Sequence, residues 1–84
     1  MIIKIHKLTL VYTTKNLGSN VLDKSVYYSS KDRALKMLKR FRDEYKDMIV
    51  GGKVLNDEPD VFVVYNENNG EYLDIRITNV DLYD

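Results

Sequence analysis

Apolar residues recur every three or four positions in the middle of the chain, and this spacing predicts one amphipathic helix over about residues 30–49. Its apolar stripe comprises Ala34, Leu38, Phe41, Tyr45 and Met48, widened by Leu35, Met37 and Ile49. Ser29 or Ser30 can cap the first turn, and Gly51 can adopt the left-handed conformation that ends a helix. A helix of this length is marginal alone in water, so the stripe must be buried against the rest of the chain.

Alternation of apolar and polar residues predicts four strands, over about residues 2–14, 21–28, 61–68 and 71–78. In the first strand the apolar residues change phase and fall into two sets, Ile3 and Ile5 on one face and Leu8, Leu10 and Tyr12 on the other. A bulge near His6 and Lys7 would return both sets to the core side. Without a bulge, the strand is buried on both faces in different halves.

The dipeptide Asn69-Gly70, between the last two strands, is a strong hairpin signal. A two-residue turn there places Val64 opposite Ile75 and Phe62 opposite Ile77. The inward face of this hairpin then comprises Phe62, Val64, Leu73, Ile75 and Ile77. The outward face is more apolar than solvation requires and carries Val61, Val63, Tyr65, Tyr72, Asp74 and Arg76.

The elements together predict one α+β domain over residues 1–84, with the order ββαββ: a four-stranded antiparallel sheet and one helix packed on one face. Residues 53–60 contain the only proline, Pro59, and are expected to form a loop or a short edge segment. The strand order is not fixed by the pattern. A helix on one face leaves the other face open, and its valines and tyrosines favour a bound partner or a second copy of the chain.

Charge is divided unevenly along a chain whose formal net charge is zero. Residues 1–56 carry twelve Lys or Arg and five acids, whereas residues 57–84 carry Arg76 and eight acids. If the two segments pack together, much of this charge cancels within the fold. Arg42, at the border of the apolar stripe, is expected to lay its stem over the core with the guanidinium at the rim.

The residue types of catalysis and metal binding are sparse. The chain has no cysteine, which excludes disulfides and thiolate metal sites. The single histidine, His6, has no partners at a meaningful spacing, and the acids Asp57, Glu58 and Asp60 lack the ligand pattern of a calcium loop. We therefore expect no cofactor and no enzymatic activity. Without an export signal or a long apolar run, a cytoplasmic protein without a membrane span is expected.

Exposed tyrosines favour a binding function, because aromatic residues on strands act either as anchors for a protein partner or as stacking platforms for bases. The second hairpin is acidic, which favours a protein partner. The predicted contact surface comprises Val63, Tyr65, Tyr72, Asp74, Arg76 and Tyr83.

The alternative is a nucleic-acid-binding module that uses a basic and aromatic patch on the first hairpin and the helix. Its residues are Lys15, Lys24, Tyr27, Lys36, Lys39 and Arg40. Such binding depends on phosphate contacts, so its affinity would fall steeply with added salt.

A strand that runs into the helix through VYYSSKDRAL, residues 26–35, followed by a basic amphipathic helix, resembles the layout of small accessory proteins of Gram-positive phages and mobile elements. Some proteins of that kind, the anti-CRISPR proteins among them, inhibit host enzymes or defence systems. The resemblance covers size, composition and layout, and it transfers no functional residue. It implies a non-catalytic inhibitor or regulator of a host macromolecule such as a defence nuclease.

Overall fold

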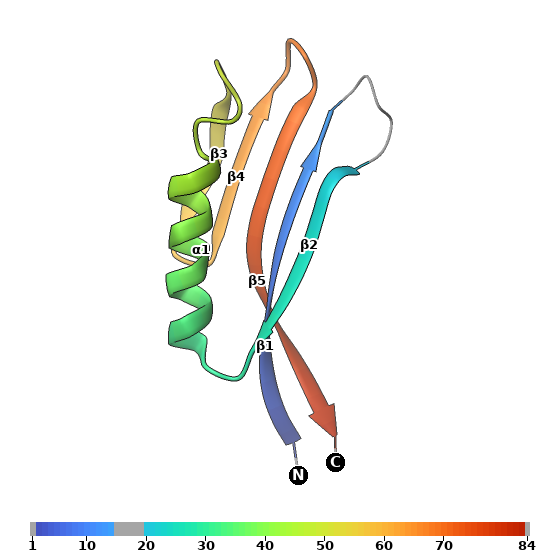
Figure 1. Cartoon of the computed structure of the whole chain (residues 1–84), viewed down its shortest axis with the longest axis vertical. Helices are drawn as coiled ribbons and strands as arrows, with labels where there is room; N and C mark the ends of the chain where they lie inside the picture. The colour runs from blue at the N-terminus through green and yellow to red at the C-terminus, as the bar shows by residue number, and fades with distance from the viewer. Residues whose placement is uncertain (1, 15–19, 84) are drawn as a thin grey trace.

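The computed structural model describes residues 2–14 and 20–83, which form five strands and one helix (Figure 1). In chain order they are β1 (Ile2–Thr13), β2 (Asn20–Tyr28), α1 (Lys31–Tyr45), β3 (Lys53–Glu58), β4 (Val61–Asn66) and β5 (Glu71–Tyr83). All strand pairs are antiparallel, and the sheet order is β2-β1-β5-β4-β3. The predicted α+β class with one helix is confirmed, whereas the predicted four strands and ββαββ order become five strands and ββαβββ.

The additional strand, β3, lies in the segment that was expected to be a loop or a short edge segment. All six of its residues are exposed, and its pairing with β4 shifts register between Val54 and Asn56. An edge strand with no buried face has no alternation of apolar and polar residues to reveal it. Residues 53–58 form a strand because they pair with β4.

The acidic segment, residues 57–84, contributes a central strand of the sheet, because β5 lies between β1 and β4. Twelve consecutive residues of β1, from Ile2 to Thr13, are paired with β5. The basic and acidic segments of the chain therefore pack together, and the ion pair between Arg42 and Asp57 joins one to the other.

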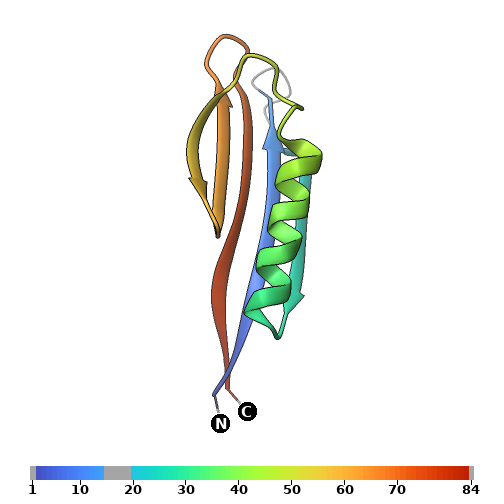
Figure 2. The same ribbon diagram turned by 90° about the vertical axis from the view of Figure 1, so that its left-hand side faces the viewer.

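The helix covers one face of the sheet and contacts β5, β1 and β2. It lies in front of β1 and β2 in Figure 2. Ala34 and Leu38 are buried, and Met37, Phe41 and Tyr45 pack against the core. The principal core of the sheet comprises Leu8, Leu10, Tyr12, Phe62, Val64, Leu73 and Ile75. Arg42 lies at the rim as predicted, with its guanidinium 3.2 Å from Asp57.

The helix is shorter than predicted, ending at Tyr45 rather than near Ile49. After Tyr45 the chain turns, with the Met48 N–H donating to the Tyr45 carbonyl at 2.9 Å, so that Met48 is exposed and Ile49 is inserted into the core. Gly51 has the expected left-handed φ of 75°. A Cβ at Gly52 would come within 2.7 Å of Ile49 and Val64, so this turn packs closely on β4.

Of the two alternatives for the first strand, the structure shows the one without a bulge at His6 and Lys7, because β1 pairs with β5 without interruption from Ile2 to Thr13. The apolar residues of β1 therefore lie on different faces of the sheet in its two halves. Leu8, Leu10 and Tyr12 face α1, whereas Ile3 and Ile5 lie on the opposite side, beyond the part of the sheet that α1 covers. There is no core on the helix side at that level to which a bulge could return them.

Residues 2–5 of β1 and 80–83 of β5 form a two-stranded arm (Figure 1). The pairing of β2 with β1 begins at His6, and the pairing of β4 with β5 ends at Arg76. Strand β5 thus continues five residues beyond its predicted end at residue 78.

The turn of the second hairpin is longer than predicted. Asn66 pairs with Glu71, so four residues separate the strands, with Gly70 at a φ of 71°. Phe62 therefore lies opposite Ile75 rather than Ile77. A shift by two residues keeps every side chain on its predicted face, because the period of a strand is two.

The helix N-cap gives a direct test of the helix boundary. The Ser30 hydroxyl accepts a hydrogen bond from the Arg33 N–H at 3.4 Å, whereas Ser29 is exposed. Ser30→Ala should lower the free energy of unfolding by about 1 kcal/mol because it leaves a first-turn N–H without its cap. Ser29→Ala is the matched control and should change it by less than about 0.5 kcal/mol. Urea denaturation measures both, and equal losses would contradict the assignment.

The buried Tyr12 predicts that the stability of the fold changes with pH in the alkaline range. Its hydroxyl donates to Glu71 at 2.7 Å, and this hydrogen bond, burial and the carboxylate charge together raise the pKa of Tyr12 from 10.0 to about 12. At neutral pH, Tyr12→Phe should cost about 1 kcal/mol of stability.

The direction of this pH dependence follows because the pKa of Tyr12 is higher in the folded state than in the unfolded state. The stabilisation by Tyr12 is complete below about pH 10 and is lost as the pH rises through the folded-state value of about 12. The difference in free energy of unfolding between the wild type and Tyr12→Phe should therefore shrink over that range. Denaturation curves at several alkaline pH values check this, and a constant difference would contradict the proposed role of Glu71.

Candidate functional site

The face of the sheet opposite α1, which we call the open face, has no described element lying over it. One group of its residues, the aromatic patch, comprises Tyr65, Tyr72, Asp74 and Arg76. Strand β4 contributes the first and β5 the other three. Tyr65 and Tyr72 are directly opposite each other in the pairing of β4 with β5, and Tyr72, Asp74 and Arg76 alternate along β5. Four of the six sequence-predicted contact residues are thus brought together on one surface.

The patch is held by a hydrogen-bonded network centred on Asp74. Arg76 donates to both carboxylate oxygens of Asp74, from Nε at 2.7 Å and from a terminal nitrogen at 2.6 Å. The Tyr72 hydroxyl donates to the same carboxylate at 2.9 Å. The rings of Tyr65 and Tyr72 meet edge to face with centroids 6.4 Å apart. Bidentate arginine hydrogen bonds and ring contacts restrict side-chain rotation, so these four side chains hold one another in place.

The four side chains of the patch differ in how much of their surface is exposed to solvent. The side chain of Arg76 is 44% exposed and that of Asp74 only 13%. Tyr65 is exposed and Tyr72 half-buried. The two tyrosines and the arginine can therefore contact a partner, whereas Asp74 mainly positions them.

Two other predicted contact residues are placed differently. Val63 lies on β4 next to Tyr65 but is only 3% exposed, so it supports the patch and presents almost no surface. Tyr83 pairs with Ile2 at the far end of β5, away from the patch, and its side chain lies outside the described part of the structure.

Neighbours from β1 complete the open face and were not identified from the sequence. The pairing of β1 with β5 sets Thr9 beside Arg76 and Val11 beside Asp74. No pattern in the sequence gives this adjacency, because β1 and β5 come from opposite ends of the chain.

The residues of the nucleic-acid alternative are divided between two sides of the molecule. Tyr27 lies on the open-face side of β2 with Lys7 5.8 Å from its ring centroid, whereas Lys36, Lys39 and Arg40 are exposed on α1. Lys24 is exposed on β2, and Lys15 lies outside the described residues. The aromatic neighbour of the helix cations is instead Tyr28, which together with Arg33, Lys36, Met37 and Arg40 lines a shallow groove of about 250 Å³.

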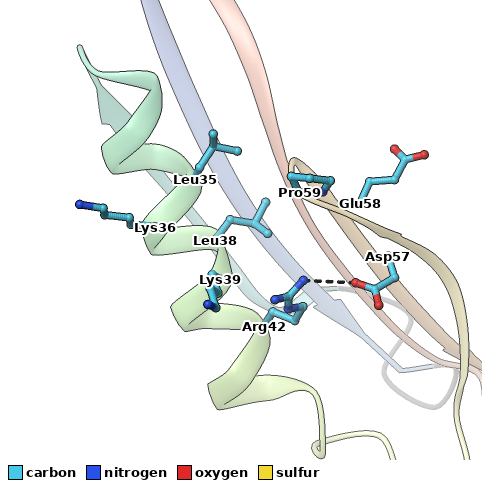
Figure 3. A pocket seen from close by; sticks show the side chains of 8 residues that line it. All are labelled: Leu35, Lys36, Leu38, Lys39, Arg42, Asp57, Glu58 and Pro59. Atoms are coloured by element: carbon cyan, nitrogen blue, oxygen red, sulfur yellow. Dashed lines mark hydrogen bonds and ion pairs between the residues drawn. The ribbon is translucent and has the colours of Figure 1, made fainter.

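A second cleft, of about 570 Å³, opens between α1 and the end of β3 (Figure 3). Its apolar residues are Leu35, Leu38 and Pro59, and its charged residues are Lys36, Lys39, Arg42, Asp57 and Glu58. The Arg42–Asp57 ion pair crosses it, whereas Lys36 extends away from it (Figure 3). Arg42 on one wall and Asp57 on the other are therefore already partners, which leaves this arginine less available to a charged ligand.

His6 is half-buried on a regular strand, and its Nδ1 lies 2.9 Å from the Asn79 side-chain oxygen. Among the described residues, no cluster of three or more His, Asp or Glu side chains could hold a metal ion. Within the same part of the chain, the helix is too short and too polar to span a membrane.

No protein-family model matches the chain, and searches of curated proteins and of solved structures find no significant match.

The hydrogen bonds around Asp74 predict how the pKa of Tyr72 responds to a substitution of Asp74. Burial, followed by the hydrogen bond to Asp74 and the charge of that carboxylate, raises the pKa of Tyr72, while Arg76 acts in the opposite direction. Asp74→Asn removes the carboxylate charge and leaves Arg76 without its partner, so the pKa of Tyr72 should fall relative to the wild type.

Nuclear magnetic resonance of tyrosines labelled at Cζ follows this titration residue by residue. Tyr12, whose carboxylate partner is Glu71, is the internal control and should titrate near pH 12 in both proteins. An unchanged Tyr72 titration in Asp74→Asn would show that the hydrogen bond is not maintained in solution.

Proposed function

We propose that this protein is a small non-catalytic binding protein that acts by protein–protein contact through the aromatic patch. The observation that carries the proposal is the ordered network of Tyr65, Tyr72, Asp74 and Arg76 on a sheet face that no described element covers. Tyrosine and arginine are the residue types that contribute most to protein interfaces. Because the patch is ordered in advance, little entropy is lost when a partner binds.

The biological role in this proposal is inhibition or regulation of a host macromolecule, such as a defence nuclease, by a protein of a phage or mobile element. The layout resemblance of residues 26–35 and the helix that follows supports this role. A surface that binds without chemistry suits such a task, because occupying an active site or an assembly interface is enough to inhibit a target. The proposal involves no cofactor.

A pull-down from bacterial lysate with the tagged protein, with and without nuclease, tests the proposal. The variant Tyr65→Ala/Arg76→Ala removes two exposed side chains of the patch. The matched control is Lys36→Ala/Lys39→Ala/Arg40→Ala, which changes only the exposed surface of α1. Circular dichroism verifies that both variants remain folded.

We expect a nuclease-resistant protein partner that is retained by the helix variant and lost by the patch variant. With the purified partner, the patch variant should bind at least about tenfold more weakly, because it truncates two interface anchors and the loss of each costs more than about 1 kcal/mol. Undiminished binding by the patch variant would show that the surface assignment is wrong.

Nucleic-acid binding is the second candidate, and the observation that favours it is the groove in which Tyr28 lies among Arg33, Lys36 and Arg40. An aromatic ring beside cations is the usual arrangement for holding an unpaired base and its phosphates. In this case the captured material would be nuclease-sensitive, its binding would weaken steeply with salt, and the helix variant would lose it.

A further inference from the structure

The arm has an open strand edge on β5. The pairing of β4 with β5 ends at Val61 and Arg76, where the Ile77 N–H donates to the Asp60 carbonyl at 2.9 Å. Backbone groups along an antiparallel strand point alternately to its two sides. Asn79 and Asp81 therefore direct their N–H and C=O groups outward as Ile77 does, and no strand of the described chain lies there.

The arm is also apolar on one face only. The cross-strand pairs Ile3–Leu82 and Ile5–Val80 lie on the open face, and Ile3 and Leu82 are 43% and 45% exposed. The helix side carries the polar pairs Lys4–Asp81 and His6–Asn79. A two-stranded ribbon is marginally stable in water, and further strands with a shared apolar face are needed to stabilise it.

The two ordinary edges of the sheet, β2 and β3, are protected in ways that the arm is not. Strand β3 has a register shift beside Leu55, the charges of Asp57 and Glu58, and Pro59 directly after it. Strand β2 carries the exposed Lys24, and its pairing is irregular near its beginning. Bulges, charges and proline are features that prevent pairing with another chain. The free edge of β5 is regular and has one charged residue, Asp81, between residues 78 and 83.

We propose that the free edge of β5 pairs with the same edge of a second copy, antiparallel, about a twofold axis at Val80. This register sets Val80 against its own copy, Asn79 against Asp81, and Thr78 against Leu82. The unsatisfied backbone groups of Asn79 and Asp81 then bond to one another across the axis. Because the formal net charge of the chain is zero, no overall repulsion opposes the approach of two copies.

Neighbouring registers are excluded on physical grounds. An axis at Asp81 would set two carboxylates directly opposite each other. An axis at Asn79 would carry the partner strand past Ile77 and into the place that β4 occupies. The Val80 register pairs residues 78–82 of the two copies, which is the part of the β5 edge beyond Ile77. It brings only Tyr83 of the second copy opposite Ile77, where the β3–β4 turn bonds to β5.

The resulting dimer has a four-stranded arm in which Ile3, Ile5, Val80 and Leu82 of both copies lie side by side on one face. The twofold axis is perpendicular to the sheet, so both aromatic patches face the same way. Self-association of this kind does not rest on the proposed function, although it would make the protein bivalent.

Light scattering on the purified protein tests association, and single cysteines test the register, because the chain has no cysteine of its own. The wild type should have about twice the monomer mass of 9.9 kDa. Val80→Cys should form a disulfide-linked dimer, since opposed residues at such a position have Cα atoms about 4.5 Å apart, within disulfide range. Thr78→Cys is the matched control, because its two copies lie on the order of 13 Å apart, and it should cross-link at most about a tenth as fast.

Asp81→Pro distinguishes edge pairing from contact between two open faces. It removes an outward N–H that the monomer does not use, so the fold should persist while the mass falls to that of a monomer. Asp81→Ala keeps the N–H and should remain dimeric. A monomeric wild type at about 1 mM, a dimeric Asp81→Pro variant, or equal cross-linking of Thr78→Cys and Val80→Cys would each overturn the proposal.

Discussion

The pairing of β1 with β5 is the interaction on which the rest of the structure depends. These strands come from opposite ends of the chain, and twelve residues of each are in register. Each of them also pairs with its own hairpin partner: β1 pairs with β2, and β5 pairs with β4. Without this central ladder the chain would separate into hairpins, which are marginally stable alone. The core exists because the ladder brings Leu8 and Leu10 of β1 beside Ile75 of β5 beneath Leu38 of the helix.

The same ladder determines which surfaces are available for binding. It places a short helix over β5, β1 and β2, and no element of residues 2–14 and 20–83 lies over the opposite face. On that face, Asp74 is enclosed by its own neighbours and orders Tyr72 and Arg76 through hydrogen bonds. Our proposal of a protein interface rests on this ordered group of aromatic and charged side chains, which are the residue types enriched at interface hot spots.

The arm follows from the length of the ladder, which exceeds that of the flanking strands and the helix. In both β1 and β5 the apolar residues change face at the same level, where His6 pairs with Asn79. Beyond that level no helix is present to bury the inward side, and the apolar residues lie on the open face instead. Two matched changes of phase in paired strands indicate a continuous structural surface, and not a local irregularity of one strand.

The sequence by itself determined the class of fold, the helix, four of the strands and the faces of the side chains in the second hairpin, because these depend on local periodicity and on the chemistry of turns. It narrowed the helix cap to Ser29 or Ser30, and the structure selects Ser30. It also grouped Tyr65, Tyr72, Asp74 and Arg76, since they belong to one hairpin. Only the tertiary structure decided the strand order, the exposed strand β3, the end of the helix at Tyr45 and the burial of Val63. Each of these depends on which distant segment lies alongside, and a one-dimensional pattern of apolar residues carries no information about that neighbour.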